Sequence, residues 1–525
     1  MLHFTKKYPI LTISAIILLF FCGTVYYVNE SSYNWLSAST IKFTNNWLND
    51  GIAADKYTML EQPRSIEAQT VQSRSLYISY PTGTVLLTYG IAKTLGYSQI
   101  NMKFVKIVGT VFFMLDALLI GLLIYLFFVH IVKLKSEYGN LILSIFLSFL
   151  WISIPSNVYY LKNVFFSDQL VLFFVYLFLL LELLKNYVPV KNSGNLKVIN
   201  GLLALTVFGG MFVDYYFWIQ IFIVCLIHLI ESKRKKEKGT IILKKLAVYI
   251  IPALLAIGLF ALQITQFDNW QHFLAVKFWE RTGQSNIIAG NYILRLGYSV
   301  YKSYQAIGLL LFLASFIAYI YLIVNKKWSV IVIFSSMVIL PAVIQLIVLI
   351  NHSAVHEFSI LKLGLPFILG IILIAYSITF YKKKSETFFL SLTTIIITGY
   401  IFYIQWNIPK YYYTRLAEQK ALYPSGFEPM VQDLNQYENV FFSFTDSIPR
   451  NPPNAVAQTK KMMYKINKEA DIKAKFPKLD SKANIMLLVN KNAQKSAQIL
   501  QEEQSATENA ELIKETNHYA VYRIK

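Results

Sequence analysis

Residues Asn29–Gly83 read NESSYNWLSASTIKFTNNWLNDGIAADKYTMLEQPRSIEAQTVQSRSLYISYPTG and form the first long polar segment of the chain, after an opening apolar run. This segment combines carboxylates with tryptophan and tyrosine residues; the carboxylates are Glu30, Asp50, Asp55, Glu61 and Glu67. A long loop of this composition between apolar runs is more typical of a functional surface than of a simple connection. Within it, Tyr33–Leu48 has an apolar helical face, which also predicts an amphipathic helix at the membrane interface.

The composition outside this segment is that of a membrane protein. The chain has 525 residues, of which 55% are hydrophobic and 16% aromatic, and its mean hydropathy is +0.46. These values exceed those of soluble globular proteins. The net charge of +20 does not indicate a nucleic-acid partner, because the basic residues cluster in short loops between apolar runs, as the positive-inside rule describes. Cys22 and Cys225 both lie in apolar runs, so neither a disulfide framework nor a metal–thiolate site is predicted.

Apolar runs of membrane-spanning length predict a polytopic helical bundle of about eleven spans. The first span is Tyr8–Val28, which follows Lys6 and Lys7 and is expected to remain as an uncleaved anchor. The other spans are predicted at Phe104–Val132, Leu141–Ile154, Gln169–Leu184, Val198–Val213, Tyr215–Ile230, Leu246–Ile264, Gln305–Val324, Ser329–Ile350, Ile360–Tyr381 and Phe388–Trp406. The basic loops place the N-terminus in the cytoplasm and the C-terminus outside the cell membrane. Thr84–Leu95 is too short to span and is expected to lie at the interface.

The composition becomes polar after the last predicted span. We therefore expect a transmembrane domain at residues 1–406, with its first outer loop at residues 29–83, and a soluble α/β domain at residues 407–525. Strands are predicted at Asn439–Thr445, Asn484–Val489 and His518–Ile524, and helices at Asn454–Ile466 and Ala493–Ser505. The predicted fold class is mainly α: a polytopic transmembrane helical bundle with a small C-terminal α/β domain outside the cell.

The predicted topology brings polar residues from several distant segments to the outer side of the membrane. Ionisable groups at membrane level are costly unless they are paired or line a wet cavity, so we expect one shared outward-facing cavity. Its carboxylates could serve as a general base or bind a divalent cation, and its cations could stabilise a phosphate leaving group. The residues placed there are Glu30, Asp50, Asp55, Asp168, Asp214, Lys277, Arg281, His352, His356 and Lys362.

These residues resemble a known family, the GT-C superfamily of polytopic glycosyltransferases, in particular its protein O-mannosyltransferase and lipid A aminoarabinose transferase branch. That branch has the motif Asp-Glu-x-x-Tyr directly after the first span, and Asn29-Glu30-Ser31-Ser32-Tyr33 stands at this place here, with asparagine for the first aspartate. The segment Tyr77–Gly83 resembles the proline-containing segment before a short amphipathic helix, and Asp168 resembles an aspartate at the outer end of a later span. The resemblance implies a polyprenyl-phosphate sugar donor, an inverting reaction on the outer face, and a lipid, glycan or protein acceptor.

On this interpretation each candidate residue has an expected role. The catalytic carboxylate is sought among Glu30, Asp50, Asp55 and Asp168. The donor phosphate is expected to bind Lys277, Arg281, Lys362, His352 and His356. The sugar or the acceptor is expected to contact Tyr33, Tyr80 and Asp214.

Other interpretations of the same residues stay open in the sequence. Glu30 could be a solvated charge at a helix end, Asp50 with Gly51 a turn, and Asp168 the N-cap of its span. His352 and His356 are four residues apart, like metal ligands on a helix, but the sequence shows no clear third ligand, so the need for a metal is undecided. Lys277 and Arg281 would look the same as anchors for anionic lipid.

Two further function classes fit a chain of this kind. A polymerase or ligase of surface polysaccharide would also have many spans and an outer cationic loop. A transporter would predict symmetric halves or helix pairs broken by glycine and proline, and no such pattern is evident. Asp116, inside the second span, has no partner that the sequence identifies.

Overall fold

The protein is described by a computed structural model. The described residues are 35–61, 74, 76–161, 163–189, 193–268, 270–282, 291–326, 329–381, 384–422, 439–444, 463–475, 484–491, 495–508, 510–517 and 519–524. The predicted first span, Tyr8–Val28, and the candidate site residues Glu30 and Tyr33 lie outside the described residues.

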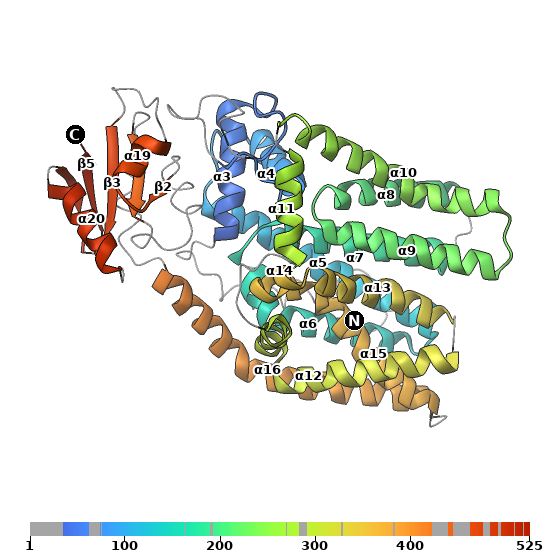
Figure 1. Cartoon of the computed structure of the whole chain (residues 1–525). Coiled ribbons are helices and arrows are strands. Elements are labelled where there is room, and N and C mark those ends of the chain that lie inside the picture. The colour runs from blue at the N-terminus through green and yellow to red at the C-terminus, as the bar shows by residue number, and fades with distance from the viewer. Residues whose placement is uncertain are drawn as a thin grey trace.

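A bundle of long apolar helices forms the main body of the molecule (Figure 1). Among the described residues, 8 helices are long and apolar enough to cross a membrane. They contain α5 (Met102–Leu126), α7 (Ser167–Asn186), α9 (Tyr215–Arg234), α10 (Gly239–Ile264), α12 (Tyr292–Lys326), α13 (Val330–Val348), α15 (Gly364–Tyr381) and α16 (Glu386–Leu422). Two further helices, α6 (Glu137–Ser153) and α8 (Ser193–Met211), occupy the predicted third and fifth spans. Each span predicted after the first one therefore coincides with a helix, because backbone groups in lipid must bond within their own helix.

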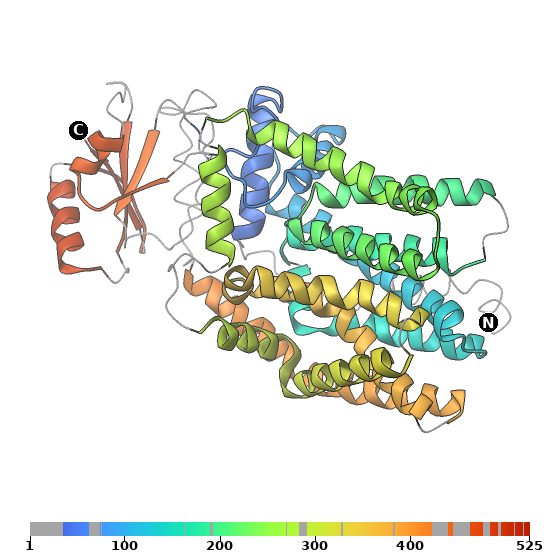
Figure 2. The same cartoon turned by 45° about the vertical axis from the view of Figure 1, so that its right-hand side comes forward.

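Three shorter helices, α3 (Trp35–Asp50), α4 (Gly83–Thr94) and α11 (Trp270–Thr282), lie across one end of the bundle in both views (Figures 1 and 2). We call this the head end, and the opposite end, where α9 connects to α10, the far end. The helix α4 confirms the short helix predicted at Thr84–Leu95.

The helix α3 differs from the expectation of an amphipathic helix resting on the bilayer, because residues 36–47 are all buried in the protein. Its polar side chains bond to the backbone of neighbouring segments instead of facing water. Thr40 Oγ1 donates to the carbonyl of Phe165 at 2.9 Å, and the side-chain amide of Asn45 bonds to both backbone groups of Ile100 at 2.8 and 3.0 Å. Burying polar groups that have such hydrogen-bond partners costs little free energy. A helix with a polar face can therefore be enclosed by the protein.

One glycine fixes where the head end meets the bundle. The backbone N–H of Gly83, at the start of α4, donates to the carbonyl of Phe212 at 2.7 Å. A side chain at this position would collide with that same carbonyl, so only glycine permits the approach. The contact holds α4 against the turn between α8 and α9, where Asp214 lies.

The C-terminal part forms a five-stranded sheet beyond the head end (Figure 1), with the strand order β2-β1-β3-β5-β4. Here β1 (Asn439–Phe444) pairs in parallel with β2 (Met463–Ile466) and β3 (Asn484–Asn490), while β5 (Tyr519–Ile524) is antiparallel to β3 and β4 (Glu511–Glu515). The short helices α19 (Ala470–Lys475) and α20 (Ala497–Glu508) complete this part.

The sheet confirms the three predicted strands and adds two. The predicted helix at Asn454–Ile466 is wrong for residues 463–466, which form β2, because pairing with β1 overrides the local helical pattern. The strand β4 was not predicted. The helix α16 continues without interruption through residues 406 and 407, where the domain boundary was expected.

Candidate active site

A buried group of charged side chains lies at the head end, contributed by segments that are distant in the sequence. Lys362 Nζ lies 2.7 Å from Asp168 Oδ1 and 3.5 Å from Asp214 Oδ2. All three residues are only 2–3% exposed. Charges buried to this degree are stable only when paired, so the two carboxylates and the ammonium group depend on one another. We call these residues, together with Tyr80, His352 and Arg281, the polar cluster.

Local structure places each charged member of the cluster at the end of an element. Asp168 lies in the first turn of α7, whose N-cap is Phe166, so Asp168 is not the N-cap itself. Asp214 is the N-cap of α9, and its Oδ1 accepts a hydrogen bond from the backbone N–H of Tyr216 at 2.7 Å. Lys362 belongs to the 3₁₀ segment η5 (Glu357–Leu363), which precedes α15.

Tyr80 connects the carboxylates to a histidine. Its hydroxyl donates to Asp168 Oδ2 at 3.1 Å and lies 3.2 Å from Nε2 of His352. Burial, together with the negative charge of Asp168, raises the pKa of Tyr80 well above its usual value. The phenol therefore stays protonated, and its O–H donates a hydrogen bond to Asp168.

His352 and His356 are uncharged at neutral pH. Burial and the nearby positive charge of Arg281 lower the pKa of His352 well below its usual value. Burial lowers the pKa of His356 to about 4, although the charge of Asp168 opposes the shift. The ring of His356 stacks on Phe358 at 5.0 Å between centroids and lies 4.7 Å from the ring of His352.

Arg281, on α11, brings a guanidinium group to the cluster. The group lies over the ring of Tyr80 at 4.7 Å and over that of Tyr215 at 5.6 Å, an arrangement that stabilises a cation. Within the described part of the chain Arg281 forms no ion pair. By contrast Lys277, one turn earlier on α11, is half-buried and paired with Glu280 at 2.7 Å.

Arg281 lines the end of an apolar cavity of about 650 Å³ between α9 and α11. Its walls are mostly aromatic and aliphatic; they include Ile78, Tyr215, Trp218, Trp270, Leu274 and Phe278. A second apolar cavity, of about 980 Å³, lies between α4, α7, α8 and α10, with Lys56 among its lining residues. Lys56 Nζ lies 3.5 Å from the carbonyl oxygen of Gln266. The first cavity is the one whose lining includes a member of the cluster, and it suits an amphiphile with an apolar tail and an anionic head.

One oxygen of the cluster has an unused hydrogen-bonding capacity. Asp214 Oδ2 is buried and accepts no hydrogen bond from any described residue, although Lys362 is nearby. Burial raises the pKa of Asp214, and the positive charge of Lys362 partly offsets this. Such an atom is a ready acceptor for a hydroxyl group of a bound molecule.

The structure places Asp55 and Asp50, the two described candidate carboxylates of the first polar loop, in a different environment. Asp55 is 1% exposed and binds Arg74, with Nη1–Oδ1 and Nη2–Oδ2 distances of 2.7 and 3.4 Å. Asp50 Oδ2 lies 3.0 Å from the same guanidinium group. Arg74 was not singled out in the sequence, because nothing local to it marks a partner some twenty residues away.

No cluster of three or more histidine, cysteine or acidic residues suited to a metal ion occurs within the described ranges. Asp116, whose role the sequence left open, is fully buried in α5, and neither of its oxygens has a hydrogen-bond partner among the described residues.

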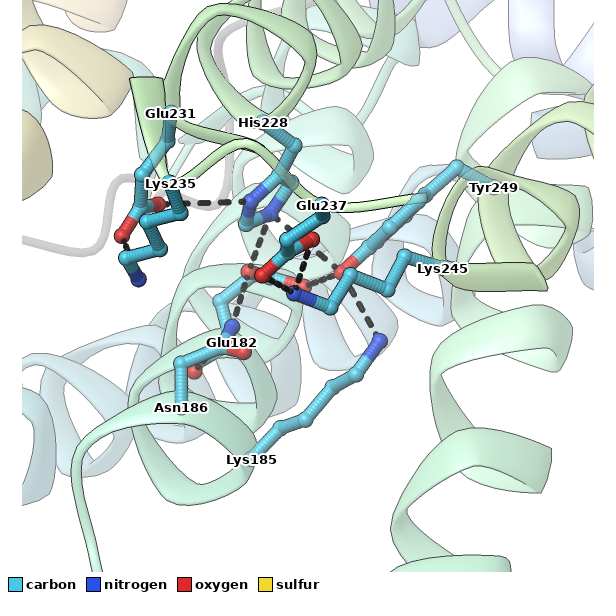
Figure 3. A network of polar contacts seen from close by, with 9 residues as sticks. All are labelled: Glu182, Lys185, Asn186, His228, Glu231, Lys235, Glu237, Lys245 and Tyr249. Atoms are coloured by element: carbon cyan, nitrogen blue, oxygen red, sulfur yellow. Dashed lines mark hydrogen bonds and ion pairs between the residues drawn. The ribbon is translucent and has the colours of Figure 1, made fainter. Parts of the chain in front are cut away.

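A second polar network lies at the far end, between α7, α9 and α10 (Figure 3). Its centre is Glu182, which is 0% exposed. The carboxylate accepts hydrogen bonds from Tyr249 and, at 2.8 Å, from Asn186, and it lies 3.1 Å from Nε2 of His228. Lys185 donates to the hydroxyl of Tyr249 at 3.0 Å. Sequence analysis did not identify this network, although a glutamate inside an apolar run was a usable signal.

Known proteins resemble this chain in structure but not in sequence. No protein-family model matches the chain, and no curated protein matches it in sequence. The structure of ArnT from Cupriavidus metallidurans bound to undecaprenyl phosphate superposes with a TM-score of 0.60, at 9% identity, over 99% of this chain and 98% of ArnT. AglB, the oligosaccharyltransferase of Archaeoglobus fulgidus, in complex with an inhibitory peptide and a dolichol-phosphate, gives 0.52 at 10% identity, over 93% of this chain and 70% of AglB. At such identities the likeness is one of fold.

Proposed function

Because the chain has the fold of the GT-C membrane glycosyltransferases, we propose that it transfers a sugar from a polyprenyl-phosphate donor to an acceptor, with inversion at the anomeric carbon. The observation that carries this proposal is the apolar cavity with Arg281 in its wall, beside the paired carboxylates of the polar cluster. The apolar walls of the cavity can hold a lipid chain. Arg281 can bind a phosphate at the same place, and the carboxylates of the polar cluster can accept hydrogen bonds from a sugar. The basic residues Lys233–Lys238 at the far end support an outward-facing head end.

The donor's lipid chain would occupy the apolar cavity between α9 and α11. Its phosphate would then meet Arg281, whose guanidinium group is already oriented by Tyr80 and Tyr215 and can bind two phosphate oxygens at once. Lys277, on the same face of α11, adds positive charge near the cavity. A cation that is held in place before binding stabilises the phosphate as it gains negative charge during bond cleavage.

The sugar would lie between Arg281 and the carboxylates. Asp214 Oδ2 is available to accept a hydrogen bond from a sugar hydroxyl, and neutral His352 and the phenol of Tyr80 offer further polar contacts. Asp168 is held by Lys362 and Tyr80 on its two oxygens, so we assign it a positioning role.

The chemical step is a single displacement. The acceptor hydroxyl oxygen forms a bond to the anomeric carbon while the bond from that carbon to the phosphate oxygen breaks, and polyprenyl phosphate leaves with the electron pair. The hydroxyl proton passes to a carboxylate acting as general base. Glu30 stays the predicted base, since Asp50 and Asp55 share Arg74 and Asp168 is held by two donors.

A transfer assay with purified protein tests the proposal. The full chain, reconstituted in lipid, would be given a panel of radiolabelled polyprenyl-phosphate sugars together with lipid, glycan and peptide acceptors. We expect release of polyprenyl phosphate, and label in the acceptor, with at least one donor. Binding of none of the donors, measured by retention of label on the reconstituted protein, would overturn the proposal.

A further inference from the structure

A third cavity lies at the head end between the first part of α12 and the outer part of α16, and the polar cluster does not include it. Its volume is about 220 Å³. Unlike the two apolar cavities, it is lined by phenols, amides, a hydroxyl and ammonium groups: Tyr298, Tyr301, Lys302, Gln305, Asn407, Lys410, Tyr411 and Thr414.

Two lysines in this lining have no anionic partner among the described residues. Neither Lys302 nor Lys410 forms an ion pair with any residue in the described ranges, whereas Lys277 and Lys362 at the same end are both paired. Lys302 Nζ lies 4.6 Å from the ring centroid of Tyr298, which holds the ammonium group near the cavity. Two ammonium groups that line one small cavity repel each other, and a bound anion removes that repulsion.

A break in α12 builds one wall of the cavity. Gln305 has φ +58° and ψ −180°, a left-handed conformation that is strained for a residue with a side chain. Side chains satisfy the carbonyl groups that the break frees: Gln305 Nε2 donates to the carbonyl of Lys302 at 2.7 Å, and the hydroxyl of Tyr400 donates to that of Tyr304 at 2.8 Å. The two parts of α12 consequently meet at an angle (Figure 2). These two hydrogen bonds therefore stabilise the strained backbone conformation of Gln305.

The side chain of Tyr411 connects the cavity to η5, the segment that also carries Lys362 of the polar cluster. Tyr411 lines the cavity, and its hydroxyl donates to Oε1 of Glu357 at 3.0 Å. Glu357 directly follows His356 and begins the segment η5, which also carries Lys362. A molecule bound in the cavity would therefore lie beside the elements that form the cluster.

We propose that this cavity binds an anionic saccharide unit, one that bears a phosphate or carboxylate group, and that this unit belongs to the acceptor of the transfer reaction. The tyrosine rings suit the faces of a sugar, and Asn407, whose Nδ2 donates to the carbonyl of Tyr403, keeps its Oδ1 for a sugar hydroxyl. The two lysines bind the anionic group. The assignment to the acceptor rests on the proposed function, whereas binding of the anionic saccharide does not.

Direct binding to the full chain in phosphatidylcholine nanodiscs tests this proposal. The probe is a fluorescent oligosaccharide with one phosphate on each repeat, and the comparison probe is the same oligosaccharide after phosphate removal. The test variant is Lys302→Gln with Lys410→Gln. The matched control is Lys93→Gln with Lys103→Gln, which removes two exposed lysines of the head end without touching the cavity. We expect the test variant to bind the phosphorylated probe about ten-fold or more weakly than wild type, and the control to bind it normally.

Several outcomes separate the proposal from its alternatives. Equal loss of affinity in the test and control variants, or equal binding of the two probes by wild type, would overturn it. Displacement of the probe by phosphatidylglycerol in the nanodisc would assign the lysines to a lipid headgroup and would also overturn it. If the double variant unfolds, the single variant Lys410→Gln replaces it, because Lys410 is exposed. This single variant should also bind the phosphorylated probe more weakly than wild type. Normal probe binding by a protein that transfers no sugar would contradict the proposed function and leave the saccharide site standing.

Discussion

The helix α7 passes through both buried polar regions of the membrane bundle, and the two regions differ in how their carboxylates are satisfied. Asp168, in the first turn, belongs to the polar cluster, and Glu182, about 21 Å further along the helix, is the centre of the far-end network (Figure 3). Glu182 is bonded by Tyr249, Asn186 and His228. No residue of that network lines any of the three cavities described above.

The polar cluster is incomplete in a way that the far-end network is not. Among the described residues, Asp214 Oδ2 lacks a hydrogen bond and Arg281 lacks an ion pair, and Arg281 lines an apolar cavity. Burial of charge alone therefore does not identify a site, because a fully bonded carboxylate stabilises helix packing equally well. A buried group with unused bonding capacity next to a cavity is the more specific indicator.

The largest expected effect concerns the base that would serve the cluster. We predict that Glu30→Gln lowers the turnover roughly a hundred- to ten-thousand-fold, because the acceptor hydroxyl loses the group that takes its proton. The measurement is the initial rate of sugar transfer at saturating donor. Asp50→Asn is the control, since Arg74 keeps Asp55 as a partner, and it should stay within a few-fold of wild type. If Glu30→Gln has normal turnover and Asp50→Asn loses its turnover, the general base is Asp50 and not Glu30.

Removing the ammonium group of Lys362 should destabilise the fold. In Lys362→Met, Asp168 and Asp214 face each other without an ammonium group between them, and we expect the free energy of unfolding to fall by about 3–5 kcal/mol. Unfolding in mixed micelles, followed by circular dichroism, measures the change. The far-end comparison is Lys185→Met, which loses a hydrogen bond and a cation–π contact with Tyr249. Equal unfolding of the two variants would mean that the cluster does not depend on this pairing.

The role of the cation at the cavity can be tested by donor binding. We expect Arg281→Ala to weaken donor affinity by about ten- to a hundred-fold, the value of one or two charge-assisted hydrogen bonds. Arg281→Lys should restore only part of it, because lysine cannot bind two phosphate oxygens in the planar geometry of arginine. Lys277→Ala should change the affinity less, since Lys277 is only half-buried and its charge is already paired with Glu280. Unchanged donor binding in Arg281→Ala would assign this residue to contact with membrane lipid.

The pH dependence of stability should reflect the buried imidazole of His356. His356 is neutral in the fold down to about pH 4, whereas in the unfolded chain it takes up a proton below about pH 6.5. The unfolded state therefore binds more protons as the pH falls from 6.5, and His356 alone should cost about 2 kcal/mol of stability at pH 5. Comparing wild type with His356→Asn in unfolding experiments between pH 7.5 and pH 5 measures this contribution. A variant with the same pH slope as wild type would contradict it.

The far-end network should influence stability without influencing catalysis. Glu182→Gln keeps the shape of the side chain but turns one acceptor into a donor facing other donors, and we expect a loss of about 1–2 kcal/mol in the free energy of unfolding. The turnover of the folded fraction should equal that of wild type. A selective loss of turnover would mean that the two ends of α7 are coupled and that the contrast drawn between them is wrong.

The sequence identified much of the candidate site as a set of residues but not as a set of contacts. Asp168, Asp214, Arg281, His352 and Lys362 were expected on one side of the membrane, because the predicted topology places the loops and span ends that carry them on the outer side. The pairing of Lys362 with Asp168 and Asp214 was not expected, since nothing in the local sequence of α7, α9 or η5 indicates which distant residue a charge will meet. The pairing of Asp55 with Arg74 was missed for the same reason.

What the sequence by itself determined is the helical bundle. A long apolar run in lipid can satisfy its backbone only as a helix, and ten predicted spans accordingly coincide with helices. The tertiary structure alone decided the burial of α3, the strand β2, the break at Gln305 and the unused oxygen of Asp214. Each of these depends on a partner far away in the chain. Hydrophobic periodicity predicts which residues are buried, but it does not predict which distant residues they contact.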